Sequence, residues 1–290
     1  MTMKKETRIL IPLDGSSIGD TVLMALFPLV YSRQVEVTLL HVAELPQIGD
    51  GVTKRLEMHR KSLQENGVPA RVVIIPGNPA EEILRQAEIG NFDLIAMATH
   101  GRSGLDRVLM GSVAEEVVRS SPVPTLLCKS ATRMGQWERI VVALDGMPGA
   151  EEVLEDAVRL ARSMNATIHL LQVGLGLLRC DGYRGLGYTL APEDPCAYLD
   201  EVAAKLLSEG VAVVPERREG MAGAEISSFA RQVDAGLICM TTQGRPEQVP
   251  GLDRSVAAEV IRHAPCPVYV RRMSGAAGIK GKEKKAAVSL

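Results

Sequence analysis

The chain has 290 residues, of which 46% are hydrophobic and 23% are charged, and its formal net charge is −2. This balance is typical of a water-soluble globular protein and excludes the strongly basic composition of a nucleic-acid-binding domain, so we expect no nucleic-acid partner. The apolar run from Ile9 to Leu13 is too short for a signal peptide or a membrane span. We therefore expect a cytoplasmic protein that does not insert into a membrane.

Ten short apolar runs rich in Val, Ile and Leu alternate with longer segments of helical period, which is the pattern of a parallel sheet covered on both faces. In chain order we predict strands near residues 8–13, 35–42, 70–75, 93–98, 123–128, 139–144, 166–173, 211–215, 236–241 and 267–271.

The helical segments carry their own end signals. Pro28 lies inside the first predicted helix and should kink or end it. The segments at about 52–66 and 195–209 each stop at a glycine, Gly67 and Gly210, suited to a left-handed cap.

An internal repeat organises these elements. Residues 8–14 (RILIPLD) return as residues 139–145 (RIVVALD), and residues 93–102 (DLIAMATHGR) return as residues 236–245 (GLICMTTQGR). A third pair, 116–129 and 259–272, follows in the same order. The chain is therefore predicted to hold two copies of one alternating α/β unit.

We set the domains at residues 1–130 and 138–273, with a tail at 274–290 that is expected to be disordered because it has small residues, lysines and little apolar periodicity. The second copy also carries an insertion, 174–195, rich in glycine and read as a mobile loop.

The segment from Ala98 to Ser112 (ATHGRSGLDRVLMGS) is the one that predicts chemistry. It follows a strand and precedes a helix that starts near Ser112. Backbone N–H groups at the start of a helix lack internal partners, and glycine lets an anion approach them closely, so such a junction can cradle a phosphate. Taken alone, the pattern is also compatible with an ordinary glycine turn, and Asp14 with a simple helix cap.

In these residues the chain resembles the universal stress protein family, whose ATP-binding members carry G-x-x-G, nine residues, then G-S or G-T. Gly101, nine residues and Gly111-Ser112 fit this pattern, and Ala98 replaces the first glycine. The resemblance implies tandem doubly wound domains with five-stranded parallel sheets of the adenine nucleotide alpha hydrolase-like type, in the strand order 3-2-1-4-5. It also implies that Asp14 and Val42 lie at the adenosine end.

The expected ligand is ATP with Mg²⁺ in the first copy, and the expected contact residues are Pro12, Leu13, Asp14, Val42, Ala98, Thr99, His100, Gly101, Arg102, Gly111, Ser112 and Val113. In the second copy, Thr241 replaces Ala98 and Arg254 stands where Gly111 does, so we expect a degenerate nucleotide site there. We expect no catalytic residue and no protein-bound metal, because the five histidines have no metal spacing and His100 is read as a loop contact.

The leading hypothesis is a nucleotide-responsive stress regulator that acts through an unidentified protein partner. A slow ATPase and a structural interaction module without nucleotide stay open as alternatives. The resemblance also implies that the two copies form an intramolecular pseudo-dimer through their last strands, 123–128 and 267–271, and leaves open whether two chains form a homodimer. The five cysteines are an odd number without a CxxC pair, which favours reduced thiols, although Cys180 and Cys196 bracket the insertion and could pair on oxidation.

Overall fold

The computed structural model describes residues 7–17, 19–32, 35–43, 50–99, 110–129, 137–147, 149–174, 195–243 and 255–274. Apart from their end positions, the insertion and the tail lie outside these residues, and so do the predictions made for them.

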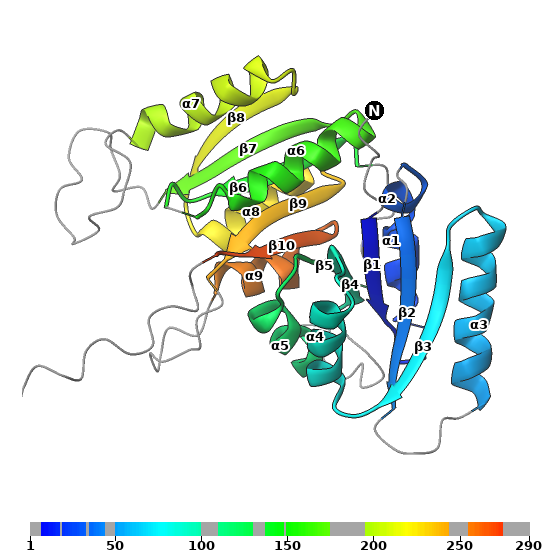
Figure 1. Ribbon diagram of the computed structural model, residues 1–290. Helices are drawn as coiled ribbons and strands as arrows, with labels where there is room; N and C mark the ends of the chain where they lie inside the picture. Colours follow the sequence, from blue (N-terminus) through cyan, green and yellow to red (C-terminus); the bar gives the residue numbers. More distant parts are fainter. Residues whose placement is uncertain are drawn as a thin grey trace, which may run out of the picture.

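The described strands form one continuous ten-stranded sheet in the order β3-β2-β1-β4-β5-β10-β9-β6-β7-β8 (Figure 1). Each half has the order 3-2-1-4-5 that the family resemblance implied. All ten strands lie at their predicted positions to within a few residues: β1 (Thr7–Pro12), β2 (Val35–Ala43), β3 (Ala70–Pro76), β4 (Leu94–Ala98), β5 (Thr125–Cys128), β6 (Arg139–Leu144), β7 (Thr167–Gly174), β8 (Val213–Glu219), β9 (Leu237–Thr242) and β10 (Val268–Arg272).

The two halves meet at β5 and β10. These strands pair antiparallel, with Leu126 opposite Tyr269, whereas the strand pairs within each half are parallel. Because each last strand covers the other's edge, neither offers open backbone groups to another chain. The intramolecular pairing through the last strands is thus confirmed.

Helices cover both faces of the sheet, and two separate cores result. Side chains alternate along each strand, so Ile9 and Ile11 enter one core while Leu10 enters the other. The first core packs under α1 (Thr21–Ala25), α2 (Phe27–Ser32), α3 (Asp50–Glu65), α6 (Glu152–Met164) and α7 (Pro195–Ser208), and the second under α4 (Pro79–Ile89), α5 (Ser112–Ser120), α8 (Ala222–Gln232) and α9 (Val256–His263).

The predicted helix signals are also found. The helix is interrupted at Leu26, which separates α1 from α2. Pro28, which has no N–H to donate, is the second residue of α2. Gly67 and Gly210 follow α3 and α7 with φ of +79° and +76°, the left-handed conformation that glycine adopts without strain.

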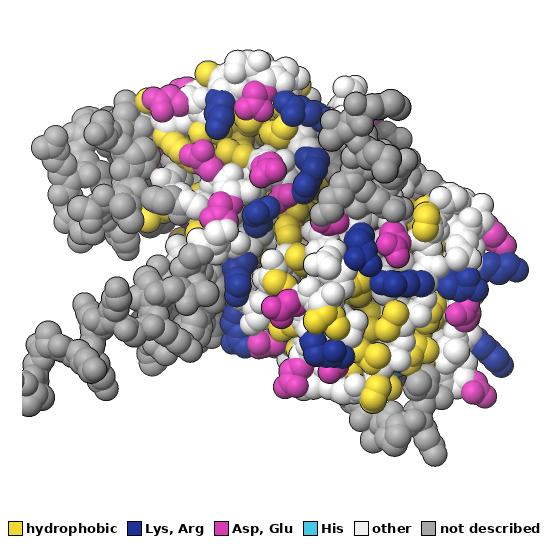
Figure 2. Space-filling view, in the orientation of Figure 1, with side chains coloured by type: hydrophobic (Ala, Val, Ile, Leu, Met, Phe, Trp, Pro, Cys, Tyr) yellow, Lys and Arg dark blue, Asp and Glu magenta, His cyan; other side chains and the backbone are white. Residues whose placement is uncertain are grey.

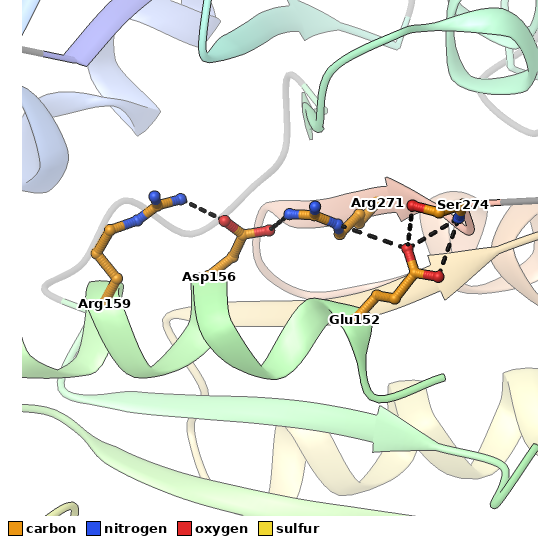
Figure 3. A network of polar contacts seen from close by, with 5 residues as sticks. All are labelled: Glu152, Asp156, Arg159, Arg271 and Ser274. Carbon is orange, nitrogen blue, oxygen red and sulfur yellow. Dashed lines mark hydrogen bonds and ion pairs between the residues drawn. The ribbon is translucent and has the colours of Figure 1, made fainter. Parts of the chain in front are cut away.

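A polar network around the buried Asp156 ties α6 to the joining strand β10 (Figure 3). The Asp156 side chain is only 3% exposed and lies between the guanidinium groups of Arg159 and Arg271, the latter 2.6 Å from Asp156 Oδ2. Glu152, one turn earlier, accepts hydrogen bonds from the backbone nitrogen and hydroxyl of Ser274 at 2.8 and 2.9 Å. The network therefore fixes the end of β10 against the first turns of α6.

On the face shown in Figure 2, basic and acidic side chains are interspersed over both halves. Among the described residues, no helix combines the length and the apolar character needed to cross a lipid bilayer.

Candidate functional site

The candidate site of the first copy lies at the carboxyl ends of β1, β2 and β4. Pro12 is the last residue of β1, Val42 the next to last of β2 and Ala98 the last of β4. β1 pairs with β2 on one side and β4 on the other, so the strand order reverses at this point. Open parallel sheets bind ligands at such a switch point because the loops diverge there and leave a crevice.

Asp14 follows β1 and is held by the turn after it. Its Oδ1 accepts hydrogen bonds from the backbone nitrogen of Ser16 at 2.9 Å and from the Ser16 hydroxyl at 2.7 Å. The helix α1 begins only at Thr21, so Asp14 shapes the turn and does not cap that helix. Its other oxygen, Oδ2, is buried and has no hydrogen-bond partner within the described part of the chain. A buried carboxylate oxygen is costly to leave unbonded, so Oδ2 is available to a ligand donor.

Leu13 positions Asp14 through its main chain. Its backbone nitrogen donates to Leu40 O at 2.8 Å, and its carbonyl accepts from His41 Nδ1 at 2.7 Å. Because a carbonyl can only accept, this bond places a proton on Nδ1 of the buried His41. The Leu13 side chain is 3% exposed and lies in the first core, so Leu13 contributes support to the site.

A helix, α5, starts where the sequence predicts a phosphate cradle, and the cradle itself stays a prediction. Gly111 is the N-cap residue, and it closes onto the end of β4 by donating from its nitrogen to Thr99 O at 2.9 Å. A Cβ added to Gly111 would lie 3.2 Å from that same oxygen, which is tighter than ordinary packing. Glycine therefore lets the helix start approach the strand end, and Ser112 and Val113 follow as its first residues.

The N-terminus of α5 has no capping side chain, because Gly111 has none. The N-terminus of α4 in the same copy differs, since Asn78 Oδ1 accepts from the nitrogens of Ala80 and Glu81. Within the described part of the chain, no N-cap side chain bonds the first-turn N–H groups of α5, which is compatible with an anion site at this positive end of the helix dipole. His100, Gly101 and Arg102 lie outside the described residues, so the predicted loop contacts stay predictions.

The second copy repeats part of this arrangement. Asp145 Oδ1 accepts from the nitrogen of Met147 at 2.9 Å, which is the same turn as that of Asp14, and α9 begins after Ser255 without a side-chain cap. Burial is the main cause that raises the pKa of Tyr198, and the nearby carboxylates of Glu151 and Asp145 raise it further. The phenol therefore stays protonated. Arg254, on which the prediction of a degenerate nucleotide site in this copy rests, lies outside the described residues.

Two features of the site were not found from the sequence. The first is His41, which the sequence showed only as one of five scattered histidines, although its place one residue before Val42 on β2 is a usable signal. The second is the cavity of about 410 Å³ at the carboxyl edge of the second copy, because its lining includes residues of α5 from the first copy.

Comparison with known proteins decides the family. The sequence model of the universal stress protein family matches this chain twice, over residues 6–129 and 136–272. The chain belongs to the universal stress protein family. A universal stress protein of Methanocaldococcus jannaschii is 30% identical over 138 residues, which cover 42% of this chain and 81% of that protein. One from Bacillus subtilis is 28% identical over 145 residues, covering 42% of this chain and 98% of that protein.

A solved universal stress protein from Archaeoglobus fulgidus resembles the whole fold. It superposes with a TM-score of 0.75 at 24% identity and covers 93% of this chain and 99% of its own. At this identity the likeness shows the fold alone, and the tandem arrangement of two family domains rests on the two matches of the sequence model.

Proposed function

We propose that the first copy binds ATP, with Mg²⁺ on the phosphates, and that the protein is a nucleotide-responsive stress regulator. The observation that carries the proposal is the joint placement of Asp14 and Gly111 at one switch point. Asp14 offers a buried carboxylate oxygen without a hydrogen-bond partner among the described residues, and Gly111 opens a helix start without a capping side chain.

The roles proposed for Asp14 and Gly111 follow from the chemistry of the two ends of a nucleotide. A carboxylate accepts hydrogen bonds from ribose hydroxyls, so Asp14 is assigned to the sugar. Backbone N–H groups and the helix dipole favour negative charge, so Gly111, Ser112 and Val113 are assigned to the phosphates. Pro12, Val42, Ala98 and Thr99 complete the proposed contacts at the strand ends, together with His100, Gly101 and Arg102.

Solved universal stress proteins include one in complex with cAMP and one from Arabidopsis thaliana with AMP bound. Their TM-scores against this chain are 0.39 and 0.32, so the proposal rests on the geometry of this chain.

We further propose that residues 1–130 form the ATP-binding domain and residues 138–273 a pseudo-dimer partner with a degenerate nucleotide site. Binding alters output by stabilising one arrangement of the segment 99–110, which changes the surface offered to a protein partner in the cytoplasm. A ligand shifts such an equilibrium only by binding the two arrangements unequally, so turnover is not required.

Calorimetric titration of nucleotide-stripped protein with ATP and Mg²⁺ tests this proposal. The expected result is one site per chain, lost in Gly111→Arg. Two sites would overturn the degenerate reading of the second copy. An absence of binding by folded protein would favour a structural interaction module, and phosphate release lost in His100→Ala would favour a slow ATPase.

A further inference from the structure

A cavity of about 410 Å³ opens at the carboxyl edge of the second copy, where β6, β7 and β9 end near Asp145, Val173 and Thr241. Its remaining walls come from α8, α9, one side of α5 and Met273. This volume lies within the range of roughly 300–1,000 Å³ that is typical of small-molecule sites. We call it the interdomain pocket, because both halves line it.

The first copy contributes one wall of the interdomain pocket. Glu115, Val118 and Arg119 of α5 line it at positions i, i+3 and i+4, which place them on one side of the helix. Met110, just before α5, lines it too. The wall follows from the pairing of β5 with β10, which brings α5 against β10. The pocket of the second copy is therefore enclosed partly by residues that do not belong to that copy.

The lining is mainly apolar. Its larger apolar side chains include Met110, Val173, Ile226, Met240, Ile261 and Met273. Three of these are methionines, whose unbranched thioether side chains adapt to the shape of a ligand. Polar residues at the strand ends and the start of α9 complete this edge of the lining, namely Asp145, Thr241, Thr242, Gln243 and Ser255. An apolar cavity with a few convergent polar groups is the usual composition of a small-molecule site.

The charges in the described lining select against an anion. Asp145 and Glu115 are carboxylates, and the guanidinium of Arg119 is paired with Glu116. Asp145 uses Oδ1 for the Met147 nitrogen, which leaves Oδ2 to accept from a ligand. The described lining therefore offers acceptors and no unpaired cation, which suits an uncharged molecule with a hydrogen-bond donor better than a triphosphate.

We propose that the interdomain pocket is a second ligand site, for a small uncharged molecule with an apolar, ring-like body and one hydrogen-bond donor. The site is separate from the nucleotide site proposed for the first copy and does not depend on it. Thr241 lies at the strand end and Ala258 on α9, so larger side chains at these positions fill the space that the ligand occupies.

Fluorescence titration with N-phenyl-1-naphthylamine, an uncharged aromatic amine with one N–H donor, tests the proposal on the full chain. We expect saturable binding to one site per chain. Thr241→Phe and Ala258→Phe should each weaken it at least about tenfold. Ala98→Phe is the matched control, because Ala98 corresponds to Thr241 in the first copy, and it should leave the dissociation constant within about twofold. Circular dichroism and thermal midpoints establish that each variant is folded.

Three results would overturn the proposal. They are the absence of saturable probe binding by folded wild-type protein, binding as tight as wild type by both Thr241→Phe and Ala258→Phe, and loss of probe binding in Ala98→Phe. Addition of ATP to the Ala98→Phe protein separates the interdomain pocket from a second nucleotide site. ATP should leave the bound probe in place, and its displacement would show that the interdomain pocket takes nucleotides. Failure of the first copy to bind ATP would leave the probe results unchanged.

Discussion

Gly111 donates its backbone hydrogen bond to Thr99 O at 2.9 Å, and a methyl group added to its Cα would lie 3.2 Å from the same oxygen. The helix start and the strand end are therefore held together at a point with room for little more than a hydrogen atom. The first N–H groups of α5 lie directly beyond this contact.

Gly111→Arg tests what this contact does. The side chain would crowd Thr99 O and occupy space beside the helix start, so ATP affinity should fall by at least about 30-fold, which corresponds to about 2 kcal/mol. Calorimetry gives the affinity. Gly51→Arg is the control, because a Cβ on Gly51 meets nothing within 4 Å, and it should leave binding unchanged. Unchanged ATP affinity in Gly111→Arg would show that the start of α5 is not part of the nucleotide site.

Asp14→Asn separates the two oxygens of that side chain. The amide oxygen can still accept from the nitrogen and hydroxyl of Ser16, while the amide nitrogen replaces the acceptor Oδ2. We expect ATP to bind about tenfold more weakly, or about 1.4 kcal/mol, with little change in the thermal midpoint. The same substitution at Asp145, whose turn is equivalent, should not affect ATP. Weaker ATP binding in Asp145→Asn but not in Asp14→Asn would place the nucleotide site in the second copy.

Asp156→Ala should destabilise the protein. It leaves Arg271, which lies on the joining strand β10, without its 2.6 Å partner, and it empties a position that is 97% buried by side-chain area. We expect the free energy of unfolding in urea to fall by about 2 kcal/mol, as for hydrogen bonds to a charged group, because Arg271 is 31% exposed and keeps Glu152 at 3.9 Å. Glu57→Ala, which breaks an exposed pair with Arg60, should cost less than about 1 kcal/mol. Equal losses would contradict a special role for the network.

The thiols of Cys128, Cys239 and Cys266 should resist modification in the folded protein. Burial raises the pKa of all three, and that of Cys266 reaches about 12. Since only the thiolate reacts, a pKa of about 12 leaves roughly one thiol in 10⁴ reactive at pH 8. In a Cys180→Ser/Cys196→Ser variant, Ellman's reagent at pH 8 should detect three thiols only after unfolding. Rapid reaction of one thiol in the native variant would contradict this.

Much of the fold was predictable from local pattern. Apolar runs such as Ile9 to Leu13 predict strands because both faces of a parallel sheet are buried, and all ten predicted strands are present. Pro28 and the terminal glycines Gly67 and Gly210 act through backbone geometry within a few residues, so their effects could also be predicted. Strand ends were less accurate: the strand predicted at 211–215 runs from Val213 to Glu219, because pairing with β7 extends it past Pro215.

The candidate site was predictable only in part. The strand-to-helix pattern of residues 98–112 predicted a helix start near Ser112, and α5 begins there. The bond from His41 to Leu13 O could not be predicted, because it joins residues 28 positions apart in a register that only the paired strands define.

By itself, the sequence determined the repeat, the alternating strands and helices and the position of the glycine junction, because each of these depends on side chains close together along the chain. Only the tertiary structure decided that β5 and β10 join the halves into one sheet, that Asp14 keeps a buried oxygen without a partner among the described residues, and that α5 of the first copy lines a pocket in the second. These relationships depend on how separate elements pack, as β5 does against β10, and the local pattern of neither element encodes that packing.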